Sequence, residues 1–497
     1  MYYLWQMNII KTRQVALQQL SCDSIDFALD SWQAAASAHV KRAVSTRDLY
    51  YRSSFTNRCE LQQQISGGED SDLEDECCIN NTFQQINNEF LATPTNHYHY
   101  ESLNSTLSEY SSEQQFLWQK PILIQGKAGR CKTETLMCCI KEHVRSGKNI
   151  LVAAPTGLLA SRFRSRVAVN VICDTVHAAF NVPIDVEEVP TTNWAISYYD
   201  IVIIDEISQI SEKIFAHIMD TFNRLVYRPV LILGGDNSQQ QPFEKKDGII
   251  VNVPSPLSNS QFVSSTYHFI LHGQHRVGDV EYLQFLDHIR NWRPNQEILN
   301  NIQHNRVIFP HGNITPTEFM NSFIENMDST ILTFTNSAAD YLNNLVVTSL
   351  FCNENALGYF HLDNTDEAFP IYKGMKVIIS QNCNKEANVV NGQMAYVETC
   401  QNHTIFLKMP NNIIVPVYQV TSEVNGQQKV SFPFRIGYAI TISKSQGQTL
   451  SKCTIWFDKD IIPPGTGYVA LSRVRKLSDV LVVTPLKPSF FTPVVCS

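Results

Sequence analysis

A glycine-containing loop that ends in a lysine and a threonine is the first stretch of this sequence that could do chemistry. Residues 121–135 read PILIQGKAGRCKTET, in which an apolar run stops at Gly126 and a helix-favouring run starts after Thr133. A strand, a glycine loop and a helix in this order hold phosphates with backbone N–H groups at the helix N-terminus. The lysine then reaches the β- and γ-phosphates, and the threonine hydroxyl binds Mg²⁺. We therefore predict an ATP and Mg²⁺ site formed by Gly126, Lys127, Ala128, Gly129, Arg130, Cys131, Lys132 and Thr133.

One position departs from the phosphate-loop pattern. The pattern is G-x-x-x-x-G-K-[ST], and this chain has Cys131 where the second glycine belongs. Glycine at that position permits close approach of the backbone to phosphate and unusual dihedral angles. A cysteine with positive φ would cost about 1–3 kcal/mol, whereas one with negative φ would only reduce the clearance for the phosphates. The loop is thus either a working phosphate site with one unusual residue or a relic.

Two adjacent carboxylates, Asp205 and Glu206, follow the apolar run at residues 201–204. Ending a buried run in two acids is unfavourable unless they face a cation or the end of a strand. We predict that Asp205 binds Mg²⁺ and that Glu206 polarises the water that attacks ATP. A third apolar run, residues 230–233, precedes Gln239, whose amide could hydrogen-bond the γ-phosphate; the alternative is an ordinary polar turn.

These candidates follow short strands that alternate with helical patterns from about residue 113 onward. The apolar runs are residues 122–124, 150–154, 201–204 and 230–233. Such alternation predicts a parallel sheet with crossover helices, in which ligands bind beyond the carboxyl ends of the strands. Thr156 and His177 also follow apolar runs, where they could contact a phosphate or a base. A lone histidine more often has a structural role, so only the position of His177 after an apolar run supports a contact with DNA.

Taken in order, the stretches resemble superfamily-one helicases of the Pif type, which are related to RecD. The first half carries GKAGRCKT, APTGLLASRF, DTVHAAF, IIDEIS and LGGDNSQQQPF. The second half carries LHGQHRV, ILTFTNSAADYLNN, YKGMKVIIS with VVNGQMAYV, YAITISKSQGQTL and GYVALSRVR. The resemblance covers about residues 113–487, and its strength lies in the number and order of the blocks. Ser443 stands where the family usually has histidine.

The resemblance implies roles for residues that the local pattern leaves open. Arg276 and Arg473 would stabilise charge on the transferring phosphoryl group, and Gln239 would sense the γ-phosphate. Without the blocks, either arginine would be read as part of a surface ion pair. The contacts to single-stranded DNA would come from Thr156, His177, Lys444 and Gln446, whereas Phe180 and Tyr468 are expected to pack in the core.

The resemblance also implies the fold class, which is α/β. We expect a P-loop NTPase with two RecA-like parallel-sheet domains, a small β-barrel-like insert and a helical N-terminal extension. The acidic stretch SGGEDSDLEDE has no basic residue, a composition typical of a solvated linker. The expected segments are a helical extension (1–61), an acidic, polar and disordered linker (62–112), domain 1A (113–255), the start of domain 2A (256–365), the insert 2B (366–430) and the remainder of domain 2A (431–497).

The composition of the chain limits the class of protein and the cellular compartment that we expect. The net charge of −8 argues against a protein that coats duplex DNA non-specifically, but it permits a motor with a local basic channel. The 13 cysteines include no C-x-x-C pair, so we expect reduced thiols rather than a zinc ribbon or redox pair. The start of the chain lacks a signal-peptide pattern, and no long apolar run predicts a membrane span. We expect an intracellular protein, in the nucleus if the source is eukaryotic.

Two functions remain after these steps. The first is an ATP-dependent DNA helicase that moves along single-stranded DNA, 5′ to 3′ by resemblance, and unwinds forked DNA in repair or recombination. The second is a degenerate, hydrolysis-impaired copy, for instance of viral or Helitron-like origin, that binds DNA or a partner without turnover. The first is favoured because seven residues of the expected machinery are retained: Lys132, Thr133, Asp205, Glu206, Gln239, Arg276 and Arg473. The oligomeric state stays open, and a monomer is compatible with the sequence.

Overall fold

The computed structural model describes residues 31–65, 114–127, 131–167, 171–183, 189–246, 249–272, 279–311, 314–363, 367–424 and 427–494. These residues form two compact units. The first holds the chain up to Ser37 and everything from Pro121 onward, and the second runs from Ala38 to Lys120. None of the described helices is long and apolar enough to cross a membrane.

The second unit contains most of a long N-terminal helix. Helix α2 (Ser31–Ile65) starts in the first unit and continues into the second, where a short 3₁₀ helix, η1 (Gln114–Gln119), follows. Tyr50 and Tyr51 both lie about 5 Å from the ring of Trp118, so aromatic packing joins α2 to η1. Helix α2 ends at Ile65, four residues past the boundary expected at residue 61. The disordered linker that the sequence predicts over residues 62–112, apart from residues 62–65, lies outside the described residues.

Six parallel strands form the first sheet, in the order β3-β2-β4-β5-β1-β8. The strands are β1 (Ile122–Gly126), β2 (Ile150–Ala154), β3 (Val171–Thr175), β4 (Ile201–Ile204), β5 (Val230–Gly235) and β8 (Tyr267–Leu271). Strands β1, β2, β4 and β5 are apolar along almost their whole length because both faces of the sheet are covered. Their carboxyl ends meet at one edge, and the predicted phosphate and acid residues follow there.

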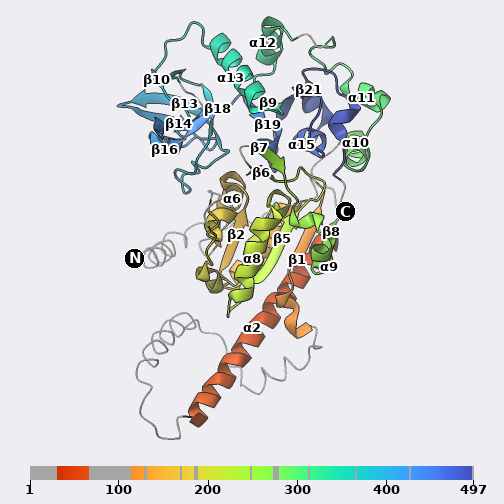
Figure 1. The fold of residues 1–497 in the computed structure, drawn as a ribbon, viewed down its shortest axis with the longest axis vertical. Coiled ribbons are helices and arrows are strands. Elements are labelled where there is room, and N and C mark those ends of the chain that lie inside the picture. The colour runs from red at the N-terminus through yellow and green to blue at the C-terminus, as the bar shows by residue number, and fades with distance from the viewer. Residues whose placement is uncertain are drawn as a thin grey trace. The chain divides into compact units, whose positions relative to one another are not determined.

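Helices cover this sheet on both faces. Alternate strand residues such as Leu123, Val202 and Leu231 share a core cluster with Phe215 and Phe222 of α8 (Glu212–Arg224), which Figure 1 shows lying across the sheet. Helix α7 (Val176–Ala179) packs into the same cluster. Helices α5 (Lys132–Arg145) and α6 (Gly157–Arg164) contact β1, β2, β3 and β5. Short elements complete the region: η2 (Trp194–Tyr198), η3 (Ile207–Gln209), β6 (Phe243–Lys246), β7 (Ile249–Asn252), η4 (Pro256–Ser258) and α9 (Ser260–Ser264).

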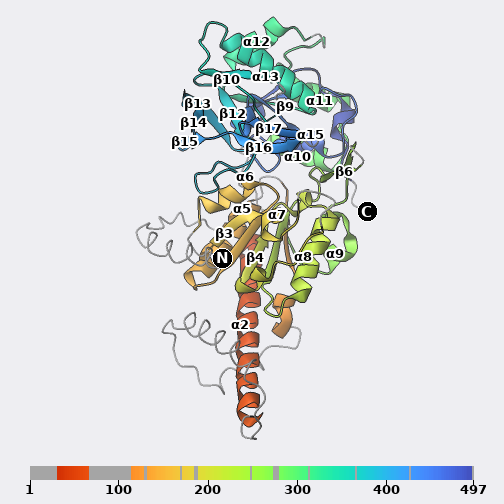
Figure 2. The same ribbon diagram turned by 60° about the vertical axis from the view of Figure 1, so that its left-hand side comes forward.

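A second parallel sheet has four strands, in the order β19-β9-β20-β21. The strands are β9 (Ser329–Thr333), β19 (Ala439–Thr441), β20 (Lys452–Trp456) and β21 (Val480–Val482). Around it stand helices of the C-terminal half, of which Figure 2 labels α10, α11, α12, α13 and α15. The helices of this half are α10 (Val280–Asn291), α11 (Gln296–Gln303), α12 (Pro316–Glu325), α13 (Asn336–Leu350), α14 (Ile442–Ser445), α15 (Thr466–Leu471), η5 (Leu477–Asp479) and η6 (Pro488–Phe491).

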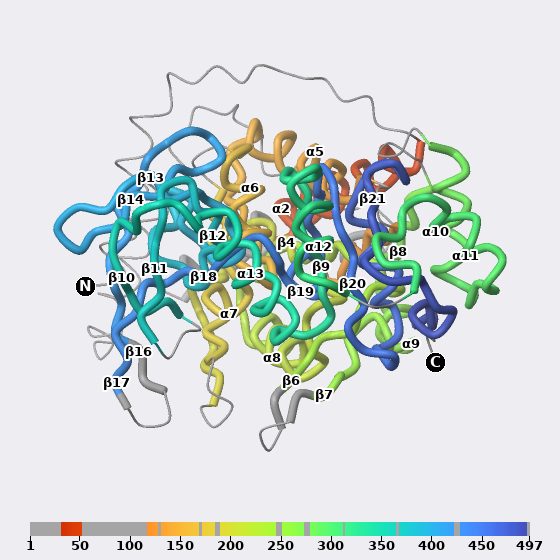
Figure 3. The backbone as a smooth tube through the Cα atoms, turned by 90° about the horizontal axis from the view of Figure 1, so that it is seen from above, coloured from red at the N-terminus to blue at the C-terminus, as the bar shows by residue number. Residues whose placement is uncertain are grey.

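An antiparallel insert interrupts this second domain between α13 and β19. Its main sheet has the order β15-β14-β13-β12-β18, and two hairpins flank it, β10 with β11 and β16 with β17. The strands are β10 (Gly358–Phe360), β11 (Phe369–Ile371), β12 (Lys376–Ile379), β13 (Met394–Gln401), β14 (Thr404–Lys408), β15 (Ile414–Val417), β16 (Val420–Val424), β17 (Gln427–Ser431) and β18 (Phe434–Ile436). Figure 3 shows the insert on one side of the four-stranded sheet.

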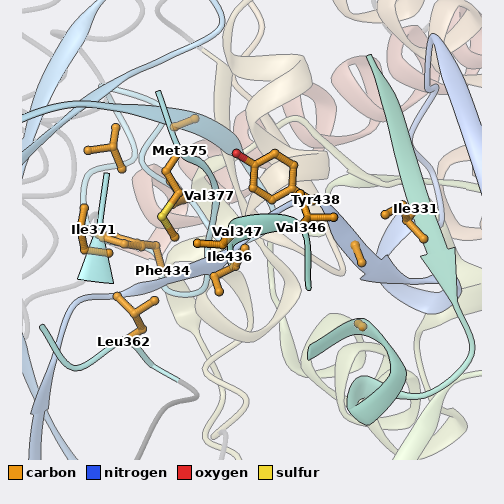
Figure 4. Close-up of a cluster of buried hydrophobic side chains, with 14 of the residues drawn as sticks. Ile331, Val346, Val347, Leu362, Ile371, Met375, Val377, Phe434, Ile436 and Tyr438 are labelled. Atoms are coloured by element: carbon orange, nitrogen blue, oxygen red, sulfur yellow. The ribbon is translucent and has the colours of Figure 1, made fainter. Parts of the chain in front are cut away.

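The insert and the second sheet share one hydrophobic core. Met375, Val377 and Phe434 of the insert belong to the same buried cluster as Ile331 of β9 and Val346 of α13. Figure 4 shows Tyr438 between these two groups of side chains. Because the cluster is continuous, the insert is anchored to the second domain by apolar packing.

The observed sheets differ from the predicted segments at two borders. Strand β8 pairs in parallel with β1, so the first domain extends at least to Leu271 rather than to residue 255. The exposure of YHFIL alternates along the strand, as in an edge strand, although Phe269–Leu271 is itself a short apolar run. The insert starts with β10 and ends with β18, so it is wider than residues 366–430.

Candidate active site

The lysine and threonine of the predicted phosphate loop open helix α5. Lys132 Nζ donates to the backbone carbonyls of Gly126, at 2.7 Å, and Lys127, at 3.3 Å. Thr133 Oγ1 donates to Asp205 Oδ2 at 3.3 Å, which joins the start of α5 to the end of β4. The lysine and the Mg²⁺-type ligands thus lie together at the carboxyl edge of the first sheet. Ala128, Gly129 and Arg130 lie outside the described residues.

Cys131 adopts the left-handed backbone conformation that glycine would adopt freely. Its φ is 56° and its ψ is 32°, directly before α5. The other described non-glycine residues with positive φ, apart from Glu206, are asparagines and one histidine, which tolerate this region better. The cysteine therefore stores strain of about 1–2 kcal/mol in the phosphate loop. Of the two outcomes predicted for Cys131, the positive φ therefore selects the strain cost.

Glu206 is strained and buried at the same time. Its φ is 53°, and its side chain is aimed into the protein with only 8% of the residue exposed. Burial raises the pKa of Glu206, and the neighbouring Asp205 raises it further, while Lys132 and Arg473 oppose the shift. A carboxylate with a raised pKa beside a phosphate loop is suited to accept a proton from water.

Asp205 lies in a space that stays open because residue 234 is a glycine. Its Oδ1 accepts a hydrogen bond from the Glu206 N–H at 2.9 Å, and Oδ2 faces Thr133. A side chain at Gly234 would place its Cβ 2.8 Å from Asp205 Oδ1, so β5 ends in small residues. Burial raises the pKa of Asp205, and Lys132 opposes this shift. Thr133 and Asp205 are one hydroxyl and one carboxylate at a phosphate loop, the usual protein share of a Mg²⁺ site, so the residues fit that ion.

A further acid, Asp236, lies in this region and was not among the predicted site residues. It follows β5 and accepts hydrogen bonds from Arg290 of α10, at 2.8 Å, and from Tyr468 of α15, at 3.4 Å. Burial alone would raise the pKa of Asp236, but Arg290 and Lys132 hold it below its ordinary value. The signal was available, because Asp236 also follows an apolar run, as Asp205 does. Its partner Arg290 could not be assigned from the sequence.

Three glutamines, a serine and a threonine connect the two domains beside these acids. Gln446 Nε2 donates to Gln239 Oε1 at 3.1 Å, and Ser443 Oγ donates to Gln240 Oε1 at 2.9 Å. Gln240 in turn donates to Thr466 Oγ1. The predicted γ-phosphate sensor Gln239 is therefore in direct contact with the second domain, and Ser443 keeps a polar contact at the position where histidine was expected.

Arg473 is almost completely buried, at 1% exposure. Its guanidinium donates to the carbonyls of Val469, Ser445 and Gln448 and to the hydroxyl of Ser472. Burial lowers the pKa of Arg473, and the negative charge of Glu206 opposes the shift. The arginine thus supports the loop at 445–448 while lying within electrostatic reach of Glu206. Arg276, the other predicted arginine, lies outside the described residues.

The predicted DNA contacts divide into two kinds. Thr156 and Lys444 are exposed, and Thr156 also caps α6 by accepting the Leu159 N–H. His177 is half-buried in α7, and burial lowers its pKa. Gln446 differs from these three because it is buried and bonded to Gln239. Phe180 and Tyr468 are buried, as expected for packing residues.

The fold and the site define a P-loop NTPase with two RecA-like domains. Residues 111–244 match a protein family described as an AAA domain. The ATP-dependent DNA helicase Pif1 of Campylobacter jejuni is 24% identical over 330 residues, which is 59% of this chain and 71% of the relative.

Solved structures give the same answer for the fold. A structure of Bacteroides Pif1 bound to single-stranded DNA has a TM-score of 0.58 and 18% identity, over 80% of this chain and 95% of that one. Pif1 helicase from Candida albicans has a TM-score of 0.53 and 18% identity, over 80% and 97%. The resemblance to Pif-type helicases that the motifs indicated is therefore confirmed, by sequence and by fold.

Proposed function

We propose that this chain is an ATP-dependent DNA helicase that moves on single-stranded DNA and unwinds forked duplexes. One observation carries the proposal: Lys132, Thr133 and Asp205 converge at one sheet edge, beside a buried Glu206. The Pif1 relatives support the choice of DNA as the substrate, since solved structures include one bound to single-stranded DNA and one with ADP-AlF₃ and single-stranded DNA.

The residues suggest a division of labour in ATP hydrolysis. Mg²⁺, held by Thr133 and Asp205, would neutralise charge on the β- and γ-phosphates. Lys132 would leave its carbonyl partners to bind the same phosphates, and Glu206 would accept the proton of the attacking water. Gln239 would sense the γ-phosphate, and Arg473, with Arg276, would stabilise the charge that develops during transfer.

The contacts between the domains suggest how hydrolysis is linked to movement. Gln239 is bonded to Gln446, and Gln240 to Ser443, so a change at the γ-phosphate would reach the loop at 443–449 directly. That loop also carries Lys444, which with Thr156 and His177 would contact the DNA backbone and bases. Opening and closing of the domains in each ATP cycle would then advance the strand.

Several finer features belong to the same proposal. The polarity would be 5′ to 3′, the roles would lie in repair or recombination, and the protein would lie in the nucleus if its source is eukaryotic. The second sheet with its insert would act as domains 2A and 2B, and the six-stranded sheet as domain 1A. The basis for these assignments is the Pif resemblance.

The test is ATP hydrolysis with and without single-stranded DNA, followed by unwinding of forks with a 5′ or a 3′ tail. We expect DNA-stimulated hydrolysis, unwinding from the 5′ tail, and loss of both in Lys132→Ala. Lys141→Ala, on the same helix, is the matched control. If the wild type is inactive and Cys131→Gly restores hydrolysis, the chain is the hydrolysis-impaired copy instead.

A further inference from the structure

Arg162 of helix α6 connects the first domain to the second. Its guanidinium donates a hydrogen bond to the Gly447 carbonyl, in the loop that follows α14 of the second domain. Helix α6 is capped by Thr156, an exposed residue and one of the predicted DNA contacts. The arginine therefore joins a helix that carries a predicted DNA contact to a loop of the opposite domain.

The loop that receives Arg162 is built for close docking on α6. Gly447 has a φ of 76°, and a Cβ there would lie 2.6 Å from Leu159 Cδ2 of α6. On its other side the loop is held by Arg473, which donates to the carbonyls of Ser445 and Gln448 at 3.2 Å. One arginine from each domain therefore holds this loop, and Gln446 between them contacts the predicted γ-phosphate sensor.

We propose that Arg162 is a positioning residue that transmits occupancy of the DNA site on α6 to the loop at 445–448 and, through Gln446, to the predicted γ-phosphate sensor Gln239. A movement of α6 on binding DNA would carry the guanidinium, and with it the Gly447 carbonyl. The coupling rests on the proposed DNA-dependent ATPase activity. It concerns a residue that the motifs left unassigned.

Three substitutions separate the charge from the hydrogen bond. Arg162→Ala removes both, Arg162→Lys keeps the charge, and Arg162→Gln keeps an N–H donor without charge. The ratio of ATPase rates with and without single-stranded DNA is expected to fall about tenfold or more in Arg162→Ala, the effect of losing one charge-assisted hydrogen bond. Arg162→Lys, which keeps a charged N–H donor, restores most of the ratio, and Arg162→Gln restores less of it. Arg166→Ala is the matched control, because Arg166 pairs with Glu134 at the surface and keeps the wild-type ratio.

The measurements are ATPase rates with and without single-stranded DNA, single-stranded DNA affinity by anisotropy, and thermal unfolding of each variant. A reduced ratio that Arg162→Lys restores, with unchanged DNA affinity and folding, supports the proposal. A wild-type ratio in Arg162→Ala overturns it, as does a loss of ratio that only follows a loss of DNA affinity or folding. If the wild type itself shows no stimulation by DNA, the proposed function fails, and the coupling fails with it.

Discussion

The phosphate edge of the first domain and the loop at 443–449 of the second domain face the same site but are built in opposite ways. At the phosphate edge, Cys131 and Glu206 hold positive φ angles, and two adjacent acids are buried. In the second domain, the buried Arg473 donates four hydrogen bonds, and the positive φ of the loop belongs to a glycine. Strain and unfavourable charge are thus concentrated where chemistry is expected, and a relaxed, satisfied structure holds the partner surface.

The largest expected effect comes from removing the buried base. Glu206→Gln should lower kcat for ATP hydrolysis by about 10²–10⁴-fold, because the water loses its proton acceptor. The same change should raise the unfolding temperature, since it removes a buried negative charge. Kinetics and calorimetry on one preparation measure both effects. Glu281→Gln, at an exposed position, should change neither. A fall in stability would show that the acid is not under strain.

A substitution of Arg473 tests the loop at 443–449, the second region of the comparison. Arg473→Ala should destabilise the protein by about 3 kcal/mol, because buried carbonyls lose their donors. Arg475→Ala is the control, since Arg475 is exposed two residues away. Thermal unfolding distinguishes them. If Arg473→Ala lost ATPase activity with no change in unfolding temperature, the arginine would serve catalysis alone and the loop would not depend on it.

The pH dependence of hydrolysis follows from the raised pKa of Glu206. Because its pKa lies above the ordinary value of 4.5, kcat should fall toward acid pH at a higher pH than an unperturbed glutamate gives. The effect of pH on the free energy of unfolding is the reverse. The folded state binds this proton more tightly than the unfolded state, so Glu206 destabilises the protein less as the pH falls through its pKa. Rate profiles and unfolding curves between pH 4 and 8 check this, with Glu206→Gln as the reference. An acidic limb at the ordinary glutamate pKa would contradict it.

The smallest effect should come from Cys131→Gly. Relief of the left-handed backbone is worth about 1–2 kcal/mol, part of which is offset by the greater freedom of glycine in the unfolded chain. We expect a small gain in stability and a lower KM for ATP, measured by calorimetry and steady-state kinetics. Asn181→Gly is the matched control, since Asn181 has a similar φ of 51° but a side chain that tolerates it. A gain in the control as large as in Cys131→Gly would mean that the cysteine is not specially strained.

The apolar runs of the sequence were enough to predict the core of the first sheet and the order of the chemical groups along it. Runs such as ILI and IVII can be recognised because strands buried on both faces need continuous apolar residues, and the residue after each run must lie at the sheet edge. Strand β8 was not predicted, although it contains the run Phe269–Leu271, and its alternating exposure follows from its place at the edge of the sheet.

Only the tertiary structure decided which side chains meet across the chain and which backbone angles they hold. The pairs Asp236 with Arg290 and Gln239 with Gln446 join residues far apart in sequence, and no local pattern encodes such contacts. The φ of Cys131 likewise depends on how the loop is closed by its neighbours rather than on the residue type. Spacing along the chain specifies local elements, whereas distance in space is set by the packing of whole sheets and helices.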